Sequence, residues 1–370
     1  MDLARVAAPS TFAFDGRKFR THRFSRDIEE RVKQLNRLDN WHAPLAYTRD
    51  ILLIVLSVAG CVELSYGFYP LALLVVGSRQ RAFSNLLHES AHGMAAGNRK
   101  LNLALGTFLT AYPIFQRHYA YKRSHVATHH PRLGDPERDP DLRYLVEQGV
   151  YEPATRRELW LRLVVLPALG SRLVSHLRFL LRDRVLLRDR VLLQRRPEPA
   201  GGGPSDHRRR RLRWDAAALA GFWVAVLTTV VATGTLVELV LFWLVPHLTT
   251  FQLIGWYIEL SEHTPMVRFH NTDIRMTRNR KSRGLERFLT GTYADHYHLD
   301  HHLDPRTPYW NLAKAHRVRM EDPRYAAIDA TFGGLVTRGP DGQPSALESI
   351  ISELAVPRDR ARQESEKPRE

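Results

Sequence analysis

The chain has 370 residues, of which 44% are apolar, and this is enough for a large core or for several membrane spans. Its net charge of +15 predicts an anionic partner, such as acidic lipid, an acidic protein or nucleic acid. The single cysteine, Cys61, excludes an internal disulfide, a thiolate zinc finger and an iron–sulfur cluster held by cysteines.

Residues 1–50 are polar and lack the apolar stretch that a signal peptide requires. We expect them to form a cytosolic arm with an amphipathic helix at residues 27–38. Apolar residues then gather in two regions, 51–76 and 214–260, which contain very few charges. Because a span needs about 20 apolar residues, both regions predict membrane helices.

The second region holds two spans, near residues 214–232 and 236–260. The first is ambiguous. It is either one long span or a hairpin with spans near 51–66 and 69–92, in which Pro70 begins the second helix. Four spans in two hairpins is the arrangement that we expect.

Charge distribution favours two hairpins. Neither of their outer turns would contain Lys or Arg, whereas all basic stretches would lie on the other side of the membrane. That asymmetry predicts a multi-pass protein whose basic side is cytoplasmic. The alternative is a soluble all-α protein, which we disfavour because core helices seldom run this long without a polar face.

The segments between the hairpins are mixed in character. Residues 101–115 are apolar but too short for a span, which favours a re-entrant or interfacial segment. Residues 158–193 end in the tandem repeat LLRDRVLLRDRVLL and read as a basic amphipathic helix, either on the membrane surface or simply solvated. A flexible linker at 195–206 leads to RRRRLR at 208–213. This run directly precedes a span, so it is better explained as a cytoplasmic anchor than as a nucleic-acid site.

The fold class expected from these elements is all-α and integral membrane. An N-terminal arm (1–50) precedes a membrane domain (51–320), in which about four helices form two hairpins and a cytosolic helical cap holds a metal site. A polar C-terminal tail follows at 321–370, and we expect it to be disordered from about Val356.

Histidines are concentrated in three short windows, HESAH, HVATHH and HLDHH, which hold eight of the 18 in the chain. On a helix, residues three or four apart share a face, so each window should aim its imidazoles at one point. Eight imidazoles exceed what one tetrahedral zinc can use and suit two metal ions with open positions. Imidazole favours Zn, Cu, Fe or Ni, and iron is the choice that brings oxygen chemistry.

The three histidine boxes would meet on the cytosolic side if both hairpins form. A fourth candidate on that side is His263, at the end of the last span and one turn after Glu259.

The boxes HxxxH, HxxxHH and HxxHH, in that order and with two spans between the second and third, resemble the membrane fatty acid desaturase and hydroxylase superfamily of di-iron enzymes. The pair Glu262–His263 and the stretch TRNRKSRGLERFLTGTYADHYHLDHHLDPRTPYWNLAKAH strengthen the resemblance, which covers roughly residues 45–320. It implies these iron ligands: His88, His92, His125, His129, His130, His263, His298, His301 and His302.

One position departs from the family pattern. Some members have an asparagine with a water ligand one turn before the extra histidine, where this chain has Glu259. Whether Glu259 or Glu262 touches a metal stays open. Carboxylates often orient ligating imidazoles, and the candidates for that role are Glu89, Glu259, Glu262, Asp295 and Asp300. Four histidines are not expected to be ligands: His118, His247, His270 and His316.

The resemblance implies two iron ions, O₂ as co-substrate and desaturation of an acyl chain or lipid-like substrate. Hydroxylation of a carotenoid or a small secondary metabolite would use the same ligands and stays open. The chain has no dinucleotide fingerprint and no haem-attachment motif, so electrons must come from another protein. A ferredoxin-type donor would suit the basic face, and no nucleic-acid partner is expected.

Two other functions are compatible with parts of the sequence. HESAH also satisfies the HExxH signature of zinc proteases, with Glu89 as general base, but this leaves the other two boxes unexplained. A heavy-metal transporter would carry ionisable residues within its spans, and these spans contain few.

Overall fold

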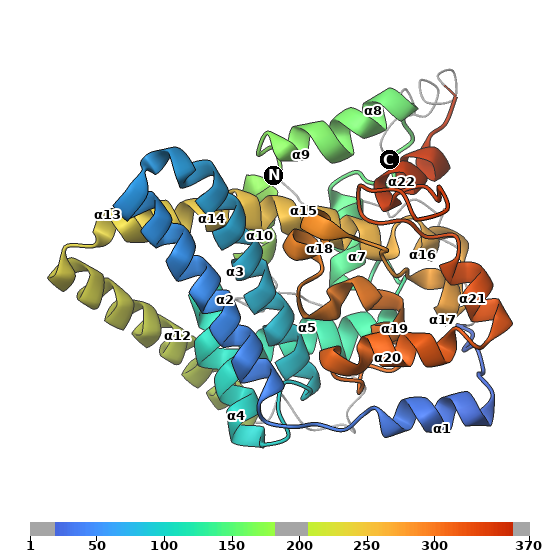
Figure 1. Cartoon of the computed structure of the whole chain (residues 1–370), viewed down its shortest axis with the longest axis horizontal. Coiled ribbons are helices and arrows are strands. Elements are labelled where there is room, and N and C mark those ends of the chain that lie inside the picture. The colour runs from blue at the N-terminus through green and yellow to red at the C-terminus, as the bar shows by residue number, and fades with distance from the viewer. Residues whose placement is uncertain (1–18, 182–205, 358–370) are drawn as a thin grey trace.

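The computed structural model describes residues 19–181 and 206–357. The linker at 195–205, most of the tandem repeat at 180–193 and the tail beyond 357 lie outside the described residues. The prediction of an all-α fold is confirmed, because apart from two isolated β-bridges the regular structure in the described part is helical (Figure 1).

The first apolar region forms a helical hairpin. Helix α2 (His42–Ala59) continues through a π turn (Gly60–Leu64), and α3 (Tyr69–His92) runs back beside it. The turn lies at Ser65, whose hydroxyl accepts a hydrogen bond from the Gly67 amide at 3.1 Å. Pro70 stands in the first turn of α3, where its missing N–H costs nothing.

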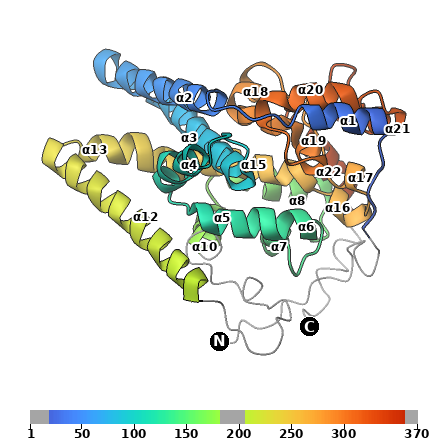
Figure 2. The ribbon, with the colours of Figure 1, turned by 90° about the horizontal axis from the view of Figure 1, so that it is seen from below.

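The second region forms another hairpin. Helix α12 (Asp206–Thr233) turns at Gly234, whose φ of 71° suits glycine, into a nearly continuous run of helix. That run comprises α13 (Leu236–Leu239), a π turn (Val240–Leu244), α14 (Val245–Leu248) and α15 (Thr250–His263). Figures 1 and 2 show the turns of both hairpins at the same end of the molecule.

Three helical segments are long and apolar enough to cross a membrane: His42–Leu64, Arg213–Thr233 and Leu236–Phe269. Large apolar side chains on them point outward, including Leu56, Val231 and Val237, and this suits contact with lipid. Helix α3 is not among the three. Its second half carries polar and charged side chains, most of them buried, because α3 is the central helix that α2, α15 and α5 (His118–Ser124) surround.

The short apolar segment after the first box does not cross the molecule as a single helix. It consists of α4 (Arg99–Ala104), a π turn (Leu105–Ala111) and a 3₁₀ turn (Tyr112–Ile114) that pack along α3. The amphipathic helix expected at residues 27–38 is α1, with bounds Arg26–Gln34 and Ser25 as its N-cap.

The remaining helices form a cap at the end opposite the hairpin turns (Figure 2). Part of the expected basic amphipathic segment is described: α8 (Arg156–Trp160), α9 (Leu166–Ala168) and α10 (Leu173–Phe179). The others are α6 (His130–Arg132), α7 (Pro140–Glu147), α16 (Met266–Phe269), α17 (Asp273–Met276), α18 (Gly284–Thr290), α19 (His298–Leu303), α20 (Tyr309–Arg319), α21 (Pro323–Asp329) and α22 (Ala346–Leu354).

Candidate metal centre

The three histidine boxes and His263 lie on separate elements that come together in the cap. The first box ends α3, which Gly93 terminates with a left-handed φ of 84°. The second box follows α5 and forms a π turn (His125–His129) that leads into α6. The third box is α19, and His263 is the last residue of α15.

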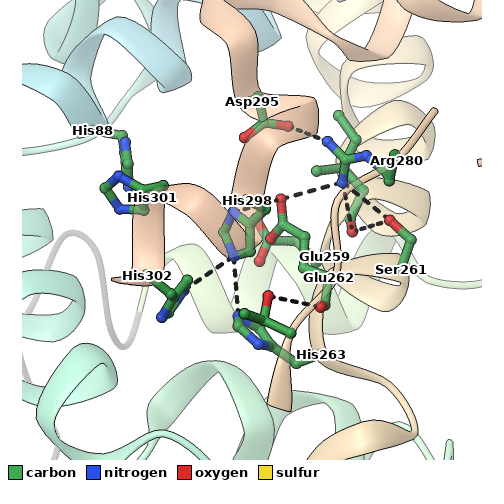
Figure 3. A network of polar contacts seen from close by, with 12 residues as sticks. His88, Glu259, Ser261, Glu262, His263, Arg280, Asp295, His298, His301 and His302 are labelled. Atoms are coloured by element: carbon green, nitrogen blue, oxygen red, sulfur yellow. Dashed lines mark hydrogen bonds and ion pairs between the residues drawn. The ribbon is translucent and has the colours of Figure 1, made fainter. Parts of the chain in front are cut away.

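The nine predicted ligands fall into two neighbouring clusters. The first cluster brings ring nitrogens within 4.8 Å of one another, from His88, His92, His125, His130 and His301. In the second cluster, His129, His263 and His302 meet in the same way, and the Nε2 atom of His298 lies 3.1 Å from those of His263 and His302. Figure 3 shows His298 between these last two rings.

The second and third boxes each divide their histidines between the clusters. A π turn brings residue i+5 over residue i, so the Nε2 atoms of His125 and His130 meet at 3.1 Å while His129 points to the second cluster. In the α-helical third box, His298 and His302 meet, and His301 reaches His130 at 3.2 Å. The expectation that each box converges on one point therefore holds only for the first box.

The geometry of the ring nitrogens fits a bound cation. His263 donates its Nδ1 proton to the Met276 carbonyl oxygen at 3.2 Å, and His298 Nδ1 faces Glu262 at 3.4 Å. Each Nε2 then carries a lone pair, yet the two Nε2 atoms are 3.1 Å apart. Nitrogens bound to one ion at about 2.1 Å are separated by about 3 Å. The buried Nε2 atoms of His88 and His92 also have no hydrogen-bond partner among residues 19–181 and 206–357.

The electrostatics favour neutral imidazoles. Burial and the neighbouring rings lower the pKa of five cap histidines, namely His125, His130, His298, His301 and His302. A lowered pKa keeps these rings neutral, and only a neutral ring can bind a metal ion. His129 is the exception. Burial alone would lower its pKa, but the charge of Asp139 and the hydrogen bond to it raise that pKa to about 9.

Two carboxylates beside the second box were not anticipated. Asp139 Oδ1 lies 2.9 Å from His129 Nδ1, and Asp141 lies 3.7 Å from the Nδ1 atoms of His125 and His129. Asp139 is also the N-cap of α7, where it accepts a hydrogen bond from the Asp141 amide. The acidic run DPERDPD at residues 135–141, shortly after the box, was the signal that could have identified them.

Two of the predicted carboxylates form one buried network with Arg280 (Figure 3). Arg280 lies 3.3 Å from Glu262, which faces His298, and 2.5 Å from Asp295. The sequence alone would place Arg280 with its basic neighbours in residues 275–287 on the cytosolic basic face, and this is wrong, because its side chain is fully buried. Its charge is compensated internally by the two carboxylates.

The other three predicted carboxylates have different surroundings. Glu89 accepts a hydrogen bond from the Tyr309 amide at 3.0 Å, and its other oxygen lies 3.6 Å from His88 Nδ1. Asp300 contacts no box histidine; it binds His316 and Arg319 and so joins α19 to α20. Glu259 pairs with Arg81 at 3.1 Å. The four histidines excluded as ligands lie outside both clusters.

A cavity reaches the second cluster, where His129 and His263 form part of its wall. Its polar lining residues include Arg81, Gln116 and Glu259. The lining contributed by α7, α10 and α15 is largely apolar and aromatic, with Tyr144, Phe179 and Trp256 among its residues. The cavity can therefore hold a molecule that combines polar and apolar parts next to a metal site.

Comparison with known proteins agrees with this geometry. Residues 64–332 match the family described as fatty acid desaturase. The chain is also 38% identical over 333 residues to dihydrorhizobitoxine desaturase from Bradyrhizobium elkanii, an alignment that covers 90% of each chain.

Proposed function

The chain belongs to the fatty acid desaturase family, and from this premise we propose that it is an O₂-dependent desaturase in which each histidine cluster binds one iron ion. The observation that carries the proposal is the pair of adjacent clusters in which imidazole lone pairs converge. The reaction takes two hydrogen atoms from adjacent carbons, two electrons from a donor protein and two protons from water, and converts O₂ into two water molecules.

Bound iron would supply the reduction of O₂ and the attack on an unactivated C–H bond. The chain's own residues would hold and orient its ligands. The Met276 carbonyl fixes the His263 ring, and Asp139 fixes the His129 ring, each through Nδ1. The cavity would hold the substrate beside His129 and His263 and limit access of water to the reacting carbons.

For the substrate, we favour a small polar molecule over the acyl chain that family resemblance first suggests. The relative from Bradyrhizobium elkanii is named for the desaturation of dihydrorhizobitoxine and not of an acyl lipid. The polar lining of the cavity beside the second cluster supports the same choice. Hydroxylation would add one oxygen atom instead of removing two hydrogens, and mass spectrometry separates the two products.

The metalloprotease interpretation of HESAH loses its support. His88 and His92 lie with three further imidazoles, whereas a catalytic zinc uses three protein ligands in all. For the topology, we propose that the clusters lie on the cytoplasmic side. Both hairpin turns lack Lys and Arg, and they lie at the end of the molecule away from the clusters (Figures 1 and 2).

The test is metal analysis combined with a product search. We expect about two iron ions per chain in protein purified in detergent under reducing conditions. Incubation with extracts of host metabolites, O₂ and a reductant chain should give a product that is lighter by two hydrogens. One zinc per chain, with no O₂-dependent product, would contradict the proposal.

A further inference from the structure

An ion pair lies in the wall of the cavity next to the second cluster. Arg81 precedes His88 by two turns of α3, and Glu259 precedes His263 by one turn of α15, so each shares a helix face with its histidine. Their side chains meet at 3.1 Å, and both line the cavity. The pair thus lies about 6–10 Å from these histidines along the helix axes.

The polar groups that line this cavity are not fully used. The Nε atom of Arg81 and the Oε1 atom of Gln116 are buried and have no hydrogen-bond partner in the described residues. Gln116 is only 4% exposed. A buried polar atom without a partner costs free energy, so a ligand that supplies partners would bind favourably at this place.

An apolar substrate would suit this wall poorly. A methylene chain packed over the pair would desolvate two charges and leave Nε of Arg81 unsatisfied. Simple attachment of α3 to α15 does not explain the pair well either, because the Glu259 side chain is 37% exposed and a partly exposed ion pair contributes little net stability. Thr250 and Gly77 already join these two helices closely.

We propose that Arg81 and Glu259 bind the opposite charges of a zwitterionic substrate, which makes the substrate class a small amino acid with an apolar chain. Arg81 would bind the carboxylate through Nε and a terminal nitrogen, the two-point geometry that guanidinium favours. Glu259 and the free oxygen of Gln116 would accept hydrogen bonds from the ammonium group. The apolar side of the cavity, with Phe179 and Trp256, would hold the chain. The inference rests on the proposed function.

The first experiment measures binding of defined probes to the iron-loaded protein in detergent by calorimetry. The probes are L-2-aminooctanoic acid, its methyl ester, its N-acetyl derivative and octanoic acid, together with the C4–C10 series of 2-amino acids. We expect the free amino acid of best chain length to bind about tenfold or more tightly than either blocked derivative. The inference would be overturned if octanoic acid bound as tightly as aminooctanoic acid. It would also be overturned if none of the 2-amino acids bound.

Variants separate recognition from a structural role. Arg81→Gln should abolish the preference for the free acid over the ester, and Glu259→Gln the preference for the free amine over the N-acetyl form. The double variant Arg81→Gln/Glu259→Gln leaves no unpaired charge. If the pair had only a structural role, the double variant would regain the selectivity for the free amino acid that each single variant loses. We expect the double variant to remain unselective. Unchanged selectivity in variants that keep their iron contradicts the inference.

The outcomes also distinguish this inference from the proposed function. A protein that holds two irons and desaturates an acyl chain would overturn only the inference. A protein without iron would overturn the proposed function, whatever the probe affinities.

Discussion

His298 lies at the centre of the second cluster, where two other Nε2 atoms approach it within 3.1 Å. Replacing it by alanine removes one ligand from that cluster and none from the first. We therefore expect His298→Ala to lose activity and to keep about one of two irons, because the first cluster retains all five imidazoles. Metal analysis and Mössbauer spectroscopy measure this directly.

His270→Asn serves as a control for His298→Ala, since this histidine belongs to neither cluster. A His298→Ala protein that keeps both irons and full activity would show that the assignment of the second cluster is incorrect.

Asp139 orients His129 and also caps α7. Asparagine caps helices as well as aspartate does, so Asp139→Asn should leave α7 intact while removing the charge that faces the imidazole. We expect iron affinity to fall about 10–100-fold, as for other residues that orient metal ligands. Competition with a chelator gives the affinity. Asp135→Asn, a cap in the preceding turn away from the rings, is the matched control; equal affinities in the two variants would contradict the role of Asp139.

At the scale of helices, α3 and α15 approach closely at Gly77. A Cβ atom there would overlap Thr250 Oγ1, which donates to the Leu73 carbonyl, and would lie 2.7 Å from the backbone nitrogen of Phe251. We expect Gly77→Ala to lower the free energy of unfolding by about 1–3 kcal/mol, a typical cost of overpacking. Thermal unfolding in detergent is the measurement.

Gly221 on α12 supplies the control for Gly77, because a Cβ atom there meets nothing within 4 Å. Gly221→Ala should be neutral or stabilising by up to about 1 kcal/mol, through helix propensity alone. If Gly77→Ala and Gly221→Ala had the same free energy of unfolding, α3 and α15 would be able to move apart without loss of stability.

Gly255 lies on α15 one turn before Glu259 and lines the cavity, and a Cβ atom there also meets nothing within 4 Å. The Cβ atom of a larger residue therefore meets no clash here, and we expect a leucine to reduce the space in the cavity. We expect Gly255→Leu to keep both irons and to lose turnover on the order of 100-fold, because the substrate is displaced from the metal site. Iron content and initial rates are compared with those of Gly221→Leu. Unchanged turnover would show that the substrate binds elsewhere.

At the scale of the whole molecule, the sequence predicted those features of the fold and the site that depend on a local pattern of residues. Box spacing singled out eight histidines, and the end of the last span singled out His263. The apolar runs, with Pro70 at one turn, favoured two hairpins. The division of the boxes could not be predicted, because it depends on a π turn at His125–His129 that helix periodicity does not encode. Burial of Arg280 depends on two acids from distant segments, and no local pattern signals that contact.

The last prediction concerns the electron donor, which we propose to be a ferredoxin-type acidic protein. The chain carries a net charge of +15, and the basic residues that remain exposed in the cap include Arg283, the N-cap of α18, and Arg287 on α18. Exposed Leu285 and Phe288 lie on the same short helix, so this surface combines charge with apolar contact. An acidic donor would be attracted here, and salt would weaken the attraction by screening.

We expect the apparent KM for ferredoxin to rise severalfold between low and moderate salt, with little change in turnover at saturation. Neutral detergent and lipid remove the competing explanation that these residues serve only to bind anionic lipid. The charge reversals Arg283→Glu and Arg287→Glu should raise KM at low salt and flatten its salt dependence, without loss of iron. Arg26→Glu makes the same change on α1, where the side chain is 92% exposed and pairs only with Glu30 among the described residues. If this control raises KM as much as the α18 variants do, the net charge of the protein guides the donor and the α18 surface does not. A KM that is independent of salt would show that the basic residues serve only to bind the membrane.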